Sequence, residues 1–154
     1  MNIYRLIRLN LFWYAMVILV YLIVYLPIYN SIAWDYPFYF SSFIFVLFTG
    51  ITTQLLFFDN YFPVIKNLYV KVGVVFLTPF VLLFLVDIYF EFILFGDNVG
   101  YQSLANELLP LEQIRLMKYI KYLTLFFAIS SIIGALLIPI KMIRLIYRQL
   151  NQIR

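Results

Sequence analysis

Four long apolar runs dominate the chain, at residues 9–28, 38–58, 72–95 and 119–140, and short polar connections separate them. An α-helix rises about 1.5 Å per residue and the hydrocarbon core of a bilayer is about 30 Å thick, so about 20 residues cross it. Each run is long enough for one crossing. We therefore predict an all-α integral membrane protein, with one four-helix transmembrane domain over residues 1–154 and a tail at 141–154.

Composition supports the membrane prediction and removes most kinds of chemistry. Hydrophobic residues make up 66% of the chain and charged residues 12%, whereas soluble domains have about 25% charged residues. The chain has no cysteine and no histidine, which excludes thiol nucleophiles, histidine bases and the usual zinc and haem ligands. No phosphate-binding glycine loop is found either. We predict a non-enzymatic protein with no cofactor and no metal.

The distribution of basic residues predicts the orientation, because cytoplasmic connections are enriched in lysine and arginine. The first and third connections carry only Arg115, Lys118 and Lys121. The chain ends and the second connection carry the others: Arg5, Arg8, Lys66, Lys71, Lys141, Arg144, Arg148 and Arg154. This bias places both termini in the cytoplasm. Insertion and anionic lipids then explain the net charge of +4, so we expect no direct binding of nucleic acid.

Two further expectations concern the source and the first run. The high Phe, Tyr, Ile and Asn content is compatible with an AT-rich bacterial gene, so we expect a bacterial inner-membrane protein.

The first run also has features of a signal peptide, with basic Arg5 and Arg8 before it and small Ser31 and Ala33 after it. However, the run exceeds the about 7–15 apolar residues of a signal peptide. We expect an uncleaved first span.

The second run carries the most polar helical face. Ser42, Thr49 and Thr53 recur at spacings of seven and four, with Gln54 beside them. Hydroxyls and an amide gain little from contact with acyl chains, so we expect this face to pack against other helices. The alternative is a water-lined path formed where several copies meet.

The fourth run contains two pairs of small residues four positions apart. The pairs are Ser130 with Gly134 and Ser131 with Ala135. Small residues at this spacing allow helices to approach closely. The pattern predicts a helix contact, either within one chain or with a second subunit.

Asp87 and Glu91 are the acidic residues within the predicted spans, and their spacing of four places them on one helical face. Lys118 and Lys121 begin the fourth span on the same side of the membrane. We hypothesise that an acid of this pair binds one of these lysines and clasps the two helices together. The alternative is an ion or proton site.

The tail predicts an amphipathic cytoplasmic helix. Apolar residues recur at helical spacing after Pro139, which permits a kink, and the intervening basic residues are Lys141, Arg144, Arg148 and Arg154. The tail would lie on the inner leaflet, or it would extend into the cytoplasm and bind a protein partner. In the third connection, Pro110 suits the first turn of a helix that continues into the fourth span.

In span number, size and inward-facing termini, the chain resembles the small four-span immunity proteins that block pore-forming bacterial toxins. It also resembles the small membrane subunits of some phage-defence systems. This resemblance implies a non-enzymatic subunit that anchors or senses by docking other proteins, and we expect a homo-oligomer. The alternative is a small homo-oligomeric channel or ion pathway lined by the second and third spans.

Overall fold

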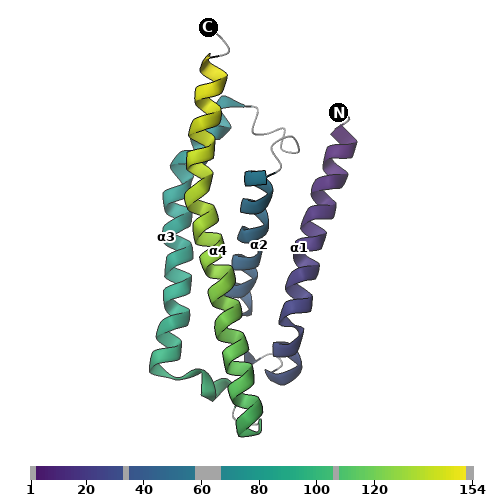
Figure 1. The fold of residues 1–154 in the computed structure, drawn as a ribbon, viewed down its shortest axis with the longest axis vertical. Helices are drawn as coiled ribbons and strands as arrows, with labels where there is room; N and C mark the ends of the chain where they lie inside the picture. Colours follow the sequence, from purple (N-terminus) through teal and green to yellow (C-terminus); the bar gives the residue numbers. More distant parts are fainter. Residues whose placement is uncertain (1–2, 33–34, 58–66, 106–107, 152–154) are drawn as a thin grey trace.

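The computed structural model describes residues 3–32, 35–57, 67–105 and 108–151, and these ranges contain only helices and short turns. The elements are α1 (Ile3–Ile32), α2 (Tyr39–Phe57), α3 (Leu68–Asn98), the short 3-10 helix η4 (Tyr101–Ala105) and α4 (Pro110–Asn151) (Figure 1). The four α-helices are long and apolar enough to cross a membrane. The predicted all-helical, multi-pass architecture is therefore confirmed at this level.

The helices differ greatly in length. The 19 residues of α2 span about 28 Å, which matches the hydrocarbon core, whereas the 42 residues of α4 span about 63 Å. Part of α4 must therefore lie beyond the hydrocarbon. Pro139 lies inside α4, and the helix continues past it to Asn151.

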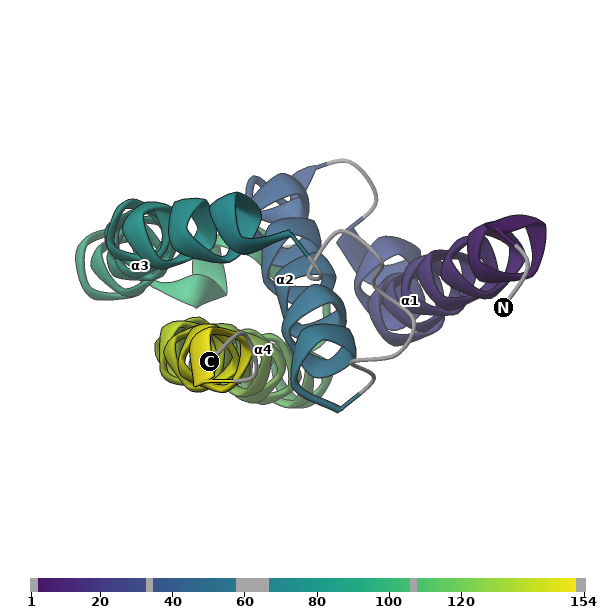
Figure 2. The same cartoon turned by 90° about the horizontal axis from the view of Figure 1, so that it is seen from above.

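The helices are packed unequally. α4 packs closely along both α2 and α3, whereas α1 contacts mainly α2. Viewed from above, α2 lies between α1 on one side and α3 and α4 on the other (Figure 2). Towards its N-terminal end α1 diverges from α2, and the start of α1 and the end of α4 lie at the same end of the bundle (Figure 1). We call this the N/C end and the opposite end the loop end.

Aromatic side chains hold the loop end together. The Phe38 ring meets Phe92 at 5.2 Å and Phe95 at 5.1 Å between ring centroids. The Tyr119 hydroxyl donates to the Val24 carbonyl oxygen at 2.7 Å and so ties α4 to α1. The C-terminal half of α1 is thus anchored in the bundle.

Local signals explain where α3 and α4 begin and end. The side-chain oxygen of Asn67 accepts from the Tyr69 backbone N–H at 3.0 Å, which caps the start of α3. After α3, Gly100 adopts a φ of 78°, a left-handed conformation that glycine tolerates best. Gly96 lies within α3. α4 begins at Pro110, as predicted.

Candidate functional site

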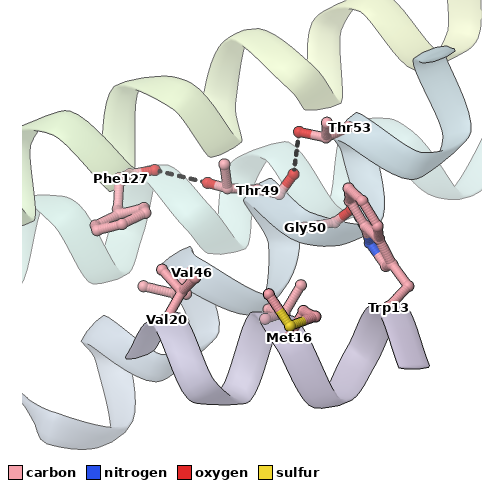
Figure 3. Close-up of a pocket in the computed structure, with 9 residues that line it drawn as sticks. Trp13, Met16, Val20, Val46, Thr49, Gly50, Thr53 and Phe127 are labelled. Atoms are coloured by element: carbon pink, nitrogen blue, oxygen red, sulfur yellow. Dashed lines mark hydrogen bonds between the residues drawn. The ribbon is translucent and has the colours of Figure 1, made fainter. Parts of the chain in front are cut away.

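A cleft opens between α1, α2 and α4 near the middle of α2. It has a volume of about 330 Å³ and is lined by residues of these three helices, among them Trp13, Met16, Thr49 and Phe127 (Figure 3). The Thr49 hydroxyl lies 2.8 Å from the Phe45 carbonyl oxygen and 3.4 Å from that of Phe127. The Thr53 hydroxyl donates to the Thr49 carbonyl oxygen at 2.7 Å. Because these hydroxyls bond to backbone carbonyls, the cleft suits apolar groups.

Gly50 sets the approach of α1 to α2 beside this cleft. A Cβ atom added at Gly50 would lie 2.5 Å from Cγ2 of Val17, which is closer than real Cβ atoms pack. The Trp13 indole N–H donates to the Gly50 carbonyl oxygen at 3.1 Å. A glycine on α2 therefore allows both the close packing and the hydrogen bond that hold the middle of α1.

The small residues of α4 pack against α2 within the same chain. A Cβ atom added at Gly134 would lie 2.5 Å from Thr52 Oγ1. Ser131 and Ala135 are buried, whereas Ser130 is half-buried. The sequence leaves open whether these small residues contact a helix of the same chain or of a second subunit. The structure places Gly134 against α2 of the same chain.

The polar face of α2 points into the bundle along the length of the helix. Ser42 and Gln54 are buried, and Thr49 and Thr53 are half-buried. The Gln54 side-chain amide donates to Asn10 Oδ1 at 2.6 Å, which links α2 to α1. These contacts are those of a packing face.

Lys141 lies at the N/C end of α2 and not on an outer surface. Its Nζ atom donates to the carbonyl oxygens of Leu55 and Leu56 at 2.7 and 2.6 Å, where the last carbonyls of a helix lack intrahelical donors. A cation there is also favoured by the helix dipole. This lysine therefore bridges α2 and α4, and its expected role at a docking or lipid surface stays a prediction.

Beyond Lys141, α4 continues as a straight segment that we call the tip, residues 142–151. One side of the tip packs on α3: Met142 and Leu145 join Val74 and Val75 in an apolar cluster. The buried Lys71 donates to the Gln149 side-chain oxygen. The other side exposes Arg144 and Arg148, while Arg154 lies outside the described residues.

The acids of α3 and the lysines of α4 are not paired with one another. Asp87, Glu91, Lys118 and Lys121 all have exposed side chains. Within the described ranges, neither carboxylate has a lysine or arginine nitrogen within 4.0 Å. The hypothesised clasp thus has no direct ion pair in the described ranges, where the exposed acids lie on an outer flank of α3.

The two lysines instead line a second hollow at the loop end. It has a volume of about 340 Å³ and is lined by Gly96, Gly100, Tyr101, Ile114, Met117, Lys118 and Lys121. The Tyr101 hydroxyl donates to the Phe92 carbonyl oxygen at 3.1 Å. Burial, followed by the negative charge of Asp97, raises the pKa of Tyr101 to about 12, so this phenol stays neutral.

A cluster of buried hydroxyls, which sequence reasoning did not group, lies near the same end. The hydroxyls of Ser42 and Thr124 lie against the phenols of Tyr25 and Tyr36, and all four side chains are buried. Within the described residues, none of the four forms a hydrogen bond of regular geometry. They come from α1, the first connection, α2 and α4, so only the tertiary fold brings them together. Burial raises the pKa of Tyr36.

Neither hollow assembles metal ligands. Among the residues that the structure describes, no three His, Cys, Asp or Glu side chains lie together. Comparisons with protein-family models, with curated proteins and with solved structures found no match to this chain.

Proposed function

We propose that this chain is a non-enzymatic subunit of the bacterial inner membrane that works by docking a protein partner at the tip of α4. The observation that carries the proposal is a second apolar stripe on this helix. Ile140, Ile143, Tyr147 and Leu150 are spaced by three, four and three residues, which places them on one helical face. Their exposed fractions are 58%, 57%, 67% and 49%. No helix of the described chain covers this stripe.

The direction of the tip argues that lipid covers only part of the stripe. Because Lys141 contacts the last carbonyls of α2, the ten residues of the tip continue about 15 Å past that level. The headgroup region adds only about 5–8 Å on each side of the hydrocarbon core. A tip that continues the axis of α4 (Figure 1) therefore carries Tyr147 and Leu150 into water.

The chemistry of the stripe fits a protein partner. Arg144 and Arg148 flank Tyr147, and both are exposed. Tyrosine and arginine are enriched among the residues that dominate protein interfaces. The contacts of Met142, Leu145 and Gln149 with α3 hold the helix in place, so little ordering entropy would be lost on binding. An acidic, partly apolar surface on the partner would complement this face.

The proposed setting follows from the charge bias. With both termini in the cytoplasm, the tip meets cytoplasmic proteins, as expected of a toxin-immunity protein or a membrane subunit of a phage-defence complex. The channel alternative has less support. In the described part of the chain, Thr49 and Thr53 bond to backbone carbonyls, and Asp87 and Glu91 lie outside the bundle.

Site-specific photo-crosslinking in the native host tests the proposal. A photoreactive residue at Tyr147 should yield a discrete protein adduct, and Arg144→Glu with Arg148→Glu should remove it. The matched control is Ile23, which is 62% exposed on α1 and should yield only lipid adducts. Lipid adducts alone at both positions would overturn the proposal, whereas ion flux through the purified chain in vesicles would support the channel.

A further inference from the structure

The acid pair on α3 lies in an apolar outer surface. Phe84, Phe90 and Leu94 are 49%, 56% and 41% exposed, and they surround Asp87 and Glu91 in the sequence. On a membrane-spanning helix, such a face meets either lipid or another protein. Ionisable residues within a bilayer almost always face protein or a water-filled cavity, because a charge in hydrocarbon is costly. The acids therefore mark a protein contact on this flank of α3.

The depth of the pair makes lipid exposure costly. Phe92 contacts Phe38, which directly precedes α2, and α2 has about the length of the hydrocarbon core. Glu91 thus lies near the loop-end edge of the hydrocarbon. Asp87 lies one turn, about 6 Å, deeper, and its short side chain reaches water less easily than a glutamate or lysine does.

The same chain carries the complementary charge near this depth. Lys121 and Gly96 line the same hollow, so they lie at similar heights in the bundle. Glu91 is five residues before Gly96, about 7.5 Å deeper along α3, and the flexible stem of a lysine can cover much of that offset. Lys118 and Lys121 have no acid within 4.0 Å in the described part of the chain.

We propose that the acid flank of α3 binds the Lys118 and Lys121 face of a second copy of this chain, with Glu91 opposite Lys121. Copies inserted in one membrane share one orientation, so the acids of one copy and the lysines of the next meet at the depths described above. The contact would give these side chains, which form no ion pair within the described residues, partners in the next copy. This inference is independent of the docking role of the tip.

Cross-linking tests the interface cleanly because the chain has no cysteine of its own. Two differently tagged chains, one with Glu91→Cys and one with Lys121→Cys, are co-expressed and treated in membranes with a short bis-maleimide. A disulfide would be too short, since it requires Cα atoms within about 7 Å. A product carrying both tags is expected. The control pairs Lys121→Cys with Phe76→Cys, which is exposed on α3 but about 22 Å deeper than Glu91, and should give none.

Charge reversal provides the second arm. Glu91→Lys and Lys121→Glu should each raise the dimer dissociation constant in mild detergent by about tenfold, which corresponds to about 1.4 kcal/mol, and the double variant should restore it. A strict monomer, or an oligomer that cross-links only through other positions, would overturn this interface. Neither result affects cross-linking at Tyr147, so the two proposals fail separately.

Discussion

At the scale of single residues, two glycines decide how closely the helices approach. Gly50 lies against Val17, and Gly134 lies against Thr52. Valine is branched at Cβ and is held in few rotamers on a helix, so it cannot easily move aside for a new methyl group. The backbone of α1 would have to shift instead.

Gly50→Ala should therefore destabilise the bundle by about 1–3 kcal/mol, the typical cost of overpacking. Gly73→Ala is the matched control, because nothing lies within 4 Å of a Cβ atom added there. Both changes gain the same helix propensity, about 0.5–1 kcal/mol, so the difference between the variants isolates the clash. Thermal unfolding in detergent measures it, and equal midpoints would contradict the proposed packing.

The residues that break the apolar pattern are readable from the sequence, but their contacts are not. The spacing of Ser42, Thr49 and Thr53 identifies an inward face. Nothing in the sequence shows that Ser42 meets Tyr36, or that Gln54 meets Asn10. Gln54 and Asn10 belong to different helices, and Tyr36 belongs to the first connection. Helix rotation and crossing, which sequence spacing does not determine, bring these partners together.

At the scale of elements, hydropathy underestimates the lengths of α1, α3 and α4 because it detects only their hydrocarbon-crossing parts. The first run was placed at 9–28, whereas α1 extends over Ile3–Ile32, and α4 extends over Pro110–Asn151 against a run of 119–140. Once a helix has formed, each added residue contributes a backbone hydrogen bond. The helix therefore continues into polar sequence until a turn signal such as Gly100 intervenes.

Lys141 of α4 holds the C-terminal end of α2, because its Nζ atom donates to the carbonyl oxygens of Leu55 and Leu56. Lys141→Met should destabilise the protein by about 1–3 kcal/mol, because two carbonyl oxygens lose a charged donor in a half-buried place. Arg144→Met, in the exposed position three residues later, should change stability by less than about 0.5 kcal/mol. Thermal unfolding of the two variants gives the comparison. A loss no larger for Lys141→Met than for Arg144→Met would show that this contact does not stabilise α2.

At the scale of the whole molecule, the bundle is asymmetric in both packing and charge. α4 packs closely on α2 and α3, while α1 diverges from α2 towards its N-terminal end (Figure 1). A cleft opens beside Trp13 (Figure 3). The tip of α4 is at the N/C end, whereas η4 is at the loop end (Figure 1). Tyr101 of η4 lines the hollow that also contains Lys118 and Lys121. The orientation of the bundle therefore decides on which side of the membrane the tip of α4 and η4 lie.

The positive-inside rule predicts that both termini lie in the cytoplasm. Cysteine labelling can test this orientation, because the chain has no cysteine of its own. Ser103→Cys, on the exposed side of η4, should react with a membrane-impermeant maleimide in intact spheroplasts. Arg148→Cys, on the tip, should react only in inside-out vesicles, because the cytoplasm then faces the reagent. Exposed Tyr4→Cys, near the start of α1, should follow Arg148→Cys. The reverse pattern would place the tip outside, and its partner would then have to be an extracytoplasmic protein.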